Sequence, residues 1–401
     1  MGDVTRVLSG LEDFEVTGAV ECGAGGLEVS VRLARPDAAC PRCGTFSSRV
    51  KEYRTQRVRD GLSYERPTVL VWTKRRFRCE TPGCVGSFTE SSGQVGPRRR
   101  VTARLCVAMA RAAWDRSTAA VARTFKVSWS TAWRAIAAAA ARKIAALPQR
   151  PPRRLGIDET TFRRHRSFMT GLVDLDTSRL WDLIEGRSKK ALLGRLEALG
   201  EQVREIEAVV IDPYAGYKAA VRDLAPHAVR VADRFHMQRL AAQALTEVRC
   251  RRQQELTGHR GRKGDPLWAV RRDLLRAREN LTDAAWERLD AAFRADCWDE
   301  LECAWTLKEM LADLYANTDR QTAEAALADW HRHANAFDVA ETNRLARTLR
   351  AWQTELLAYF DRRLTNGPTE GTNRIIKAVK RQGFGYRNPE NYRWRVLFRC
   401  A

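Results

Sequence analysis

Two closely spaced cysteine pairs constrain this chain more than any other feature of its sequence. Cys40 and Cys43 lie in the tetrapeptide CPRC, and Cys79 and Cys84 lie in CETPGC. Each pair can form a tight turn, and the strand-like segments YRTQRVRD and PTVLVWTKRRFRC can fold back to bring the turns together. The spacing predicts a tetrahedral site for structural Zn²⁺ with these four ligands. The alternative is four buried or idle thiols.

The charge of the chain points to a polyanionic partner. Its 401 residues include 70 Lys and Arg against 49 Asp and Glu, a formal net charge of +21. Because the excess is spread along the chain, nucleic acid is favoured over a membrane surface. No apolar run approaches the roughly 18 residues of a membrane span, and the first residues lack the pattern of a signal peptide. We therefore expect a cytoplasmic protein, associated with the bacterial nucleoid when it is bound to DNA.

Residues 96–147 have the pattern of a DNA-binding helical domain. After the basic segment GPRRRVTARL comes an apolar helical stretch, and two short helices follow, for which Ser117 and Ser128 are suitable N-caps. Two short helices joined by a tight turn predict a helix-turn-helix, whose second helix enters the major groove. The alternative is an ordinary Ala-rich helical hairpin, which the neighbouring arginines and the overall charge disfavour.

The side chains expected to contact DNA in this domain fall into two groups. The arginine run ahead of the helices would contact phosphates, and residues at the start of the second helix would face the groove. The candidates are Arg98, Arg99 and Arg100 for the phosphates, and Ser128, Trp129, Ser130, Thr131 and Arg134 for the groove.

The sequence changes character after the Pro-rich tract at 148–154, which we interpret as a semi-rigid linker. From there, strand and helix patterns alternate in the order β-β-β-α-β-α-β-α, which predicts a mixed sheet with helices packed on it. Asp158 and Asp212 each end an apolar strand, where a sheet can present two carboxylates side by side. Taken alone, Asp212 before Pro213 also fits a turn-initiating residue or a helix cap.

The segments GIDE, VVIDPYAGY, VADRFH and NGPTEGTNRIIKAVKRQGFGYRN together resemble the ISL branch of the insertion-sequence transposases with a DDE catalytic domain. Members of that branch carry a four-cysteine zinc-binding module, a helix-turn-helix and then the catalytic domain, in the order found here. The last segment is the most specific of the four. The resemblance implies a multidomain α/β protein whose catalytic domain has a ribonuclease H-like fold.

The same resemblance implies a catalytic triad of Asp158, Asp212 and Glu370 that would hold Mg²⁺ or Mn²⁺. Phosphoryl transfer on DNA needs two divalent cations about 4 Å apart, and hard cations prefer carboxylate oxygens. Glu370 would then be a metal ligand at a helix start, and not only a residue that the helix dipole favours there. Asp233 and His236 match accessory positions of the family, although a supporting or purely structural role fits them equally.

The expected partners are double-stranded DNA and further copies of the chain. The resemblance implies binding to the terminal inverted repeats of an insertion sequence and to target DNA, as a homodimer or higher oligomer. In the family, water frees a 3′ hydroxyl at the element end, and this hydroxyl then attacks the target strand. A basic tail after the triad Glu would bind phosphates, and its candidates are Lys377, Lys380 and Arg381.

The stretch ahead of the triad Glu is mostly helical in pattern, and we expect an all-helical insertion at about 240–364. Most of its tryptophans should be core anchors, with one of them a candidate to stack on an unpaired base. The basic segment at 250–265 is expected to interrupt the helices as a loop that touches DNA. The predicted domains are the zinc-binding region 1–95, the helix-turn-helix 96–147, the linker 148–154 and the catalytic domain 155–401.

Two alternatives to an active transposase remain open. One is an inactive or domesticated relative that only recognises element ends as a regulator, which the presence of all three acidic residues disfavours. The other is a ribonuclease H-like DNA nuclease that cuts strands without joining them, which the two N-terminal modules disfavour.

Overall fold

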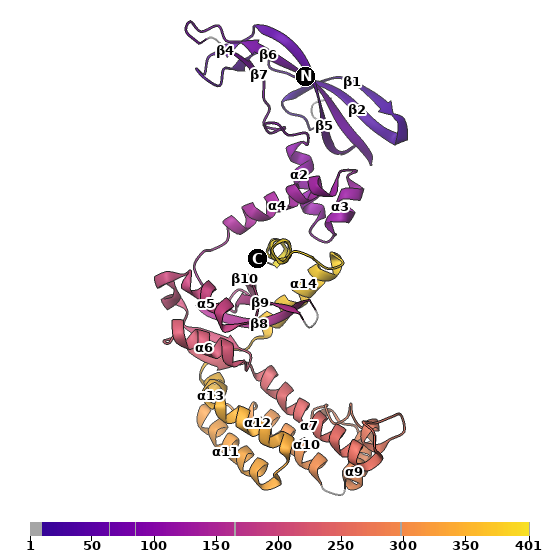
Figure 1. Ribbon diagram of the computed structural model, residues 1–401, viewed down its shortest axis with the longest axis vertical. Helices are drawn as coiled ribbons and strands as arrows, with labels where there is room; N and C mark the ends of the chain where they lie inside the picture. Colours follow the sequence, from indigo (N-terminus) through magenta and orange to yellow (C-terminus); the bar gives the residue numbers. More distant parts are fainter. Residues whose placement is uncertain (1–9, 64, 85, 164–165, 297–298, 401) are drawn as a thin grey trace. The chain divides into compact units, whose positions relative to one another are not determined.

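The chain folds into two compact units in a computed structural model (Figure 1). The first unit contains residues 1–147 and 378–399, and the second contains residues 148–377 with the last two residues of the chain. The residues that the structure describes are 10–63, 65–84, 86–163, 166–296 and 299–400.

A five-stranded sheet forms the N-terminal part of the first unit. Four of its strands run in the order β1-β2-β6-β5, and β7 pairs with β6. The long antiparallel pair β5–β6 contains the two strands predicted between the cysteine pairs. Val58, Leu70 and Trp72 point into its core, where Phe14 packs edge-on against Trp72. The elements are β1 (Phe14–Cys22), the 3₁₀ turn η1 (Gly23–Gly25), β2 (Gly26–Leu33), β3 (Ala38–Ala39), β4 (Phe46–Ser47), β5 (Val50–Ser63), β6 (Arg66–Arg78) and β7 (Ser87–Thr89).

Three helices follow the sheet in the first unit. The two predicted N-caps are confirmed, because the hydroxyls of Ser117 and Ser128 accept hydrogen bonds from the backbone N–H three residues further on. Leu105, Val121 and Ile136 form the small core between the helices. The helices are α2 (Ala103–Ala112), α3 (Thr118–Thr124) and α4 (Trp129–Ala145).

The last helix of the chain, α15 (Pro389–Cys400), packs against these helices. Phe398 contacts Ala110 and Ala140. The buried guanidinium of Arg395 donates hydrogen bonds to two backbone carbonyl oxygens after α2. A C-terminal segment is therefore part of the first unit.

A second five-stranded sheet organises the other unit, in the strand order β10-β9-β8-β11-β12. The first three strands are antiparallel, and β11 is parallel to both of its neighbours. The predicted order of three strands, helix, strand, helix, strand and helix is confirmed. The strand predicted to end at Asp158 is longer than expected, because β9 continues to pair with it as far as Arg163. The elements are β8 (Arg154–Arg163), β9 (Ser167–Asp174), β10 (Arg179–Glu185), α5 (Lys189–Glu197), η2 (Gly200–Glu205), β11 (Ala208–Ile211), α6 (Ala215–Leu224), β12 (Val229–Ala232) and α7 (Arg234–Thr257).

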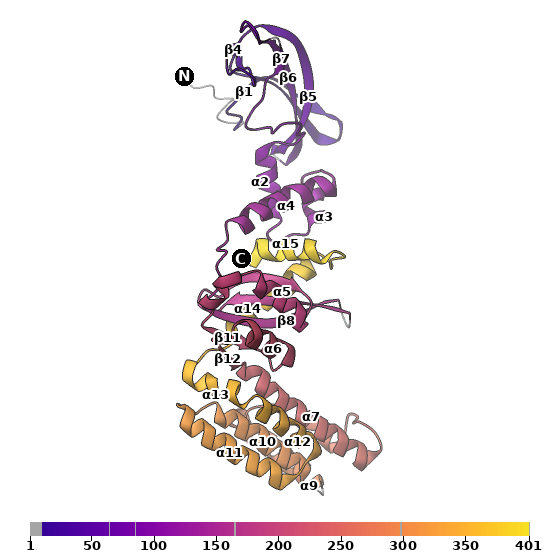
Figure 2. The ribbon, with the colours of Figure 1, turned by 60° about the vertical axis from the view of Figure 1, so that its left-hand side comes forward.

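The rest of the second unit is helical, and α10, α11 and α12 lie side by side in both ribbon views (Figures 1 and 2). Trp305, Trp330 and Trp352 are buried in its cores, as predicted for anchors, and Trp298 lies outside the described residues. None of the described helices is long and apolar enough to cross a membrane. The elements are α8 (Pro266–Ala269), η3 (Arg278–Asn280), α9 (Asp283–Ala295), α10 (Glu300–Leu314), α11 (Arg320–Phe337), α12 (Ala340–Ala351), α13 (Gln353–Arg362) and α14 (Gly367–Gln382).

The loop predicted at 250–265 is shorter than expected. Helix α7 continues to Thr257 and ends at Gly258, which adopts a left-handed conformation. Arg252 is buried on this helix and pairs with Asp296 at 2.5 Å. The period of the helix turns this arginine inward, a feature that the count of basic residues could not reveal.

Candidate metal centres and nucleic-acid interface

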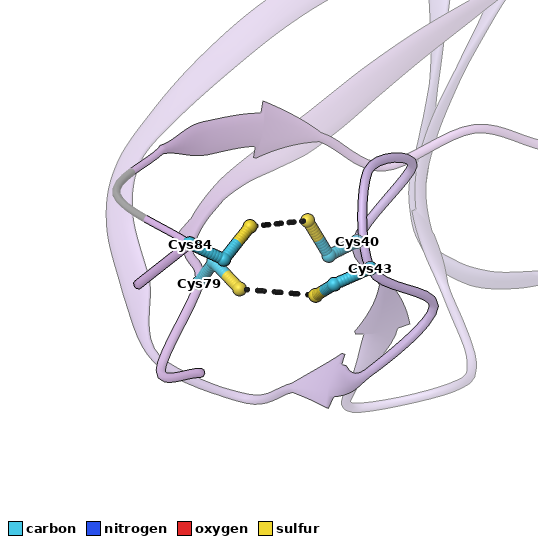
Figure 3. Close-up of side chains that lie close together, drawn as sticks. All are labelled: Cys40, Cys43, Cys79 and Cys84. Atoms are coloured by element: carbon cyan, nitrogen blue, oxygen red, sulfur yellow. Dashed lines mark hydrogen bonds between the residues drawn. The ribbon is translucent and has the colours of Figure 1, made fainter. Parts of the chain in front are cut away.

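The four cysteines predicted to bind zinc lie together, with all four sulfur atoms within 4.8 Å of one another (Figure 3). Cys40 and Cys43 come from the turn between β3 and β4, and Cys79 and Cys84 from the turn between β6 and β7. The Sγ atoms of Cys40 and Cys84 are 3.9 Å apart, and those of Cys43 and Cys79 are 3.5 Å apart. Tetrahedral bonds of about 2.3 Å to zinc would separate the sulfurs by about 3.8 Å, so the geometry fits this ion.

The electrostatics of the cluster also fit a divalent cation. A hydrogen bond with the Thr81 side chain, followed by one from the Thr45 backbone, lowers the pKa of Cys43 to about 5. Hydrogen bonds with the neighbouring sulfurs of Cys79 and Cys43 raise the pKa of Cys84 to about 12. A further thiolate is unfavourable in this cluster unless a positive charge balances it, and Zn²⁺ would supply that charge. The donor set and its spacing support structural zinc.

Three aspartates lie at the same level of three adjacent strands in the second sheet, one within β8 and two directly after β11 and β12. The last residue of β11, Ile211, is in register with Ile157 of β8 and with Ala232, the last residue of β12. The parallel pairing therefore places the residues that follow these three positions side by side, where β11 and β12 end and β8 continues. These residues are Asp158, Asp212 and Asp233.

Asp158, Asp212 and His236 place possible ligand atoms within 4.8 Å of one another. His236 lies on the first turn of α7, and its Nδ1 is 2.8 Å from both Asp212 Oδ1 and Asp233 Oδ2. The hydrogen bond of Nδ1 is made with Asp233 Oδ2. Asp212 Oδ1 is consequently buried without a hydrogen-bond partner in the described part of the chain.

The Asp212 carboxylate perturbs its neighbour Asp158. Burial, followed by the charge of Asp212, raises the pKa of Asp158 to about 7. Burial alone would lower the pKa of His236, but its close contacts with the carboxylates of Asp212 and Asp233 outweigh burial and raise this pKa to about 9. The carboxylate pair thus needs a shared proton or a cation, and its oxygen donors fit Mg²⁺ or Mn²⁺.

Helix α14 faces β8 with a row of polar residues that the sequence analysis did not single out. The Asn373 side chain donates a hydrogen bond of 2.5 Å to Asp158 Oδ2. The Asn366 side chain donates one of 3.3 Å to the backbone oxygen of Ile157. Asn366 directly precedes α14, at a position where asparagine is a favoured cap, and Asn373 lies within the helix seven residues later. Asparagine is disfavoured inside helices, so Asn373 within a helical pattern was the signal that could have been noticed.

Glu370 lies on the same helix but outside the group of clustered ligand atoms. Its side chain is 62% exposed and pairs with Arg374 at 2.9 Å. It precedes Asn373 by about one helical turn, so its backbone is close to the residue that contacts Asp158. Its role as the third carboxylate remains a prediction.

Six of the predicted DNA-contacting residues line one groove of the first unit, with a volume of about 790 Å³. The arginine run is held on β5, because Arg59 donates a backbone hydrogen bond to Arg100 and accepts one from Thr102. Arg59, Lys126 and Arg142 add positive charge, and no acidic side chain lines the groove among the described residues. The six predicted residues are Arg98, Arg99, Arg100, Ser128, Thr131 and Arg134.

The remaining predicted contacts lie elsewhere on the surface. Trp129 and Ser130 are on the exposed side of the first turn of α4, and Trp129 stacks on Trp133 with ring centroids 5.8 Å apart. On α14, two predicted residues are exposed and one is half-buried. In that order, these are Lys377, Arg381 and Lys380.

Comparison with known proteins gives three matches that follow the order of these elements. The ISL3 family model described as a transposase matches residues 155–396. A zinc-finger model of the transposases IS204/IS1001/IS1096/IS1165 matches residues 36–84, and the helix-turn-helix model of transposase family ISL3 matches residues 90–140.

Curated relatives agree with these models along most of the chain. The transposase for insertion sequence element IS1001 of Bordetella parapertussis is 28% identical over 88% of this chain and 86% of its own length. The transposase for IS1557 of Mycobacterium tuberculosis is 28% identical over 95% of this chain and 90% of its own length. The chain therefore belongs to the ISL3 family of transposases.

Proposed function

We propose that the chain binds the ends of its insertion sequence and catalyses metal-dependent cleavage and transfer of DNA strands. The observation that carries this proposal is the register of β8, β11 and β12. This register sets the carboxylate of Asp158 beside that of Asp212, whose buried Oδ1 accepts no hydrogen bond from the described residues and lies 2.8 Å from His236 Nδ1. Such a pair suits a transposase, because phosphoryl transfer on DNA commonly uses metal ions that carboxylates hold.

The proposed catalytic domain, residues 155–401, is ribonuclease H-like with the helical insertion at about 240–364, and its residues 378–399 pack within the first compact unit. A mixed sheet of three antiparallel strands followed by two parallel ones, with helices between them, supports this assignment. The zinc-binding region 1–95, the helix-turn-helix 96–147 and the linker 148–154 complete the proposed domains.

In this proposal Asp158, Asp212 and Glu370 hold Mg²⁺ or Mn²⁺, which stabilises the attacking and leaving oxygens when bound. The chain's own groups fix the carboxylates. The Glu159 N–H and the Asn373 amide each hold one oxygen of Asp158, at 2.6 and 2.5 Å. Glu370 joins the pair by giving up its ion pair with Arg374, an arginine that can then contact a phosphate.

Asp233 and His236 support the other carboxylate in the proposed site. Asp233 is buried and orients the imidazole through Nδ1. The positive charge of His236 lies 2.8 Å from Asp212 Oδ1 and offsets the repulsion within the acidic pair. Both residues therefore position a ligand of the site, which is the role that the accessory positions suggested.

The proposed DNA partners are the terminal inverted repeats and the target duplex. The basic groove beside α4 supports end binding, since it joins the arginine run to the start of the second helix of the helix-turn-helix. We propose that the protein acts as a homodimer or higher oligomer in the cytoplasm, on nucleoid DNA.

A gel assay on labelled element ends tests this function through Asp212→Asn. The variant keeps size but removes an anionic ligand, so cleavage and joining with Mg²⁺ should fall at least about 10³-fold. End binding should persist or tighten, because a negative charge facing phosphates is removed. Asp176→Asn is the matched control, since this aspartate is exposed in the turn between β9 and β10.

Near-normal cutting by Asp212→Asn would contradict the assignment of Asp212. A wild-type protein that binds ends but never cuts with Mg²⁺ or Mn²⁺ would identify a regulator. Cutting without joining would identify a nuclease.

A further inference from the structure

The turn between α14 and α15 holds an aromatic ring out into solvent. Phe384 is 93% exposed, the highest value among the exposed large hydrophobic residues of the described chain, where Tyr53 follows at 66%. A single exposed apolar side chain is ordinary on a protein surface. The backbone beneath this one is not ordinary.

Phe384 occupies a position that usually requires glycine. The Gly385 N–H donates to the Lys380 carbonyl and the Phe384 N–H donates to the Arg381 carbonyl, which is the hydrogen-bond pattern of a Schellman motif. In this motif the residue after the helix cap is left-handed, and Phe384 has φ of +53°. Among the described non-glycine residues with positive φ it is the only aromatic one.

The residues around Phe384 pack closely on one side of the turn. A Cβ at Gly383 would lie 2.6 Å from the ring of Tyr386, so that ring covers the glycine. Tyr386 in turn packs on the buried ring of Tyr392, with centroids 5.1 Å apart. Gly385 has φ of +90°, which favours glycine. The turn thus has glycines on both sides of the strained position, yet the position itself holds a phenylalanine.

The charge of the same turn indicates what the ring meets. Residues 380–387, KRQGFGYR, contain three cations and no acidic residue, and Arg381 and Arg387 are exposed. Cations that attract phosphates beside an exposed aromatic ring form the combination that binds nucleic acid by base stacking. A protein or lipid partner would be expected to need a wider apolar surface than one ring.

We propose that Phe384 stacks on a DNA base when the protein binds its DNA, and that the strained turn exists to present this ring. The inference rests on the proposed function, because it requires a DNA-binding protein. The base belongs either to an unpaired position near the cleaved end or to a base step that the ring opens. In both cases the ring of Phe384 stacks on the flat face of the base.

The test uses the full-length zinc-loaded protein and two fluorescent duplexes. Both carry 2-aminopurine in an element-end sequence, once in a pair and once opposite a gap that leaves it unpaired. Stacking of an aromatic ring quenches this fluorophore. Quenching on the unpaired probe alone identifies capture of an unstacked base, and quenching on both probes identifies a wedge.

Three substitutions at Phe384 distinguish the effect of its aromatic ring from the effect of its strained backbone conformation. Phe384→Gly removes both, so the Tm should stay the same or rise, and a binding loss cannot come from unfolding. Phe384→Leu keeps the apolar bulk and the strained φ without a ring, and Phe384→Trp keeps a ring. We expect the Gly and Leu variants to lose the quenching and to bind about 5- to 100-fold more weakly, while Trp retains both. Tyr53→Thr, which removes another exposed ring of the first unit, should match wild type.

Wild-type binding and quenching by Phe384→Gly or Phe384→Leu would overturn the inference. Unchanged DNA binding with an altered oligomeric state in sedimentation would also overturn it, in favour of a protein contact. Failure of the wild-type protein to prefer element ends over random duplex would instead count against the proposed function. If the wild-type protein binds element ends normally and the Phe384 variants bind and quench as it does, only the stacking role is excluded.

Discussion

The cysteine cluster of the first unit and the acidic centre of the second are both suited to cations, but they are assembled over different distances along the chain. The facing cysteines are separated by 36 and 44 residues, and each cysteine pair forms its own turn. The contact between Asn373 and Asp158 joins residues 215 positions apart. A site built from local turns depends on spacing, whereas a site built from distant segments depends on strand register and helix phase.

Zinc removal should have the largest effect and should stay within the first unit. In a Cys43→Ser, Cys84→Ser double variant, zinc should fall from about one per chain to none, and the cysteine module should unfold, because structural zinc contributes about 10–16 kcal/mol of binding free energy. Elemental analysis and hydrogen exchange measure this. The sheet from β8 to β12 should keep its protection. Cys303→Ser is the control, and full zinc content in the double variant would exclude the cysteine site.

Gly156→Ala should damage the acidic centre and leave the cysteine cluster intact. A Cβ at this position of β8 would lie 2.4 Å from Thr369 Oγ1 and 2.7 Å from Asn366 Oδ1. We expect α14 to shift, with a loss of about 1–3 kcal/mol of stability and of strand cleavage. Thermal unfolding and the cleavage assay measure both. Gly194→Ala in α5 is the matched control, since its added methyl would meet nothing within 4 Å. Equal behaviour of the two variants would show that the close approach is unimportant.

The groove of the first unit should separate base reading from phosphate binding. Arg134→Ala should weaken binding to element ends more than to random duplex, by about 1–3 kcal/mol. Replacing Arg98, Arg99 and Arg100 with alanine should weaken both DNAs and reduce the salt dependence by about 0.9 in log–log slope for each lost phosphate contact. Salt titrations of binding measure these effects. Equal losses of affinity for both DNAs in Arg134→Ala would show that Arg134 does not contribute to recognition of the base sequence.

Asn373→Ala should give the smallest effect of the four. The variant removes the amide that holds Asp158 Oδ2, so Mg²⁺ should activate cleavage at about 10-fold higher concentration. A positioning role predicts that excess Mg²⁺ restores most of the rate, which a metal titration measures. Asn280→Ala, at an exposed site in η3, is the control. An unchanged metal requirement would leave Asn373 a purely structural residue.

Local features of the sequence were sufficient for much of the fold. The caps at Ser117 and Ser128 depend only on the residues that follow them, and the order of strands and helices follows from hydrophobic period. The length of β8 and the inward direction of Arg252 were missed, because pairing partners and helix phase decide them. Asn373 was missed for the same reason, since its partner lies on a strand more than 200 residues earlier.

Translation produces these two regions at very different times. The cysteine module can close as soon as Cys84 leaves the ribosome, but the acidic centre waits for Asn373, which follows about 15 to 60 s later at ordinary rates of synthesis. If translation stops after Arg142, the last residue that lines the groove, the fragment contains the basic groove residues without the acidic centre. Such a fragment also lacks α15, whose Phe398 and Arg395 pack against the helices of the first unit, so this unit is complete only when the end of the chain has been made.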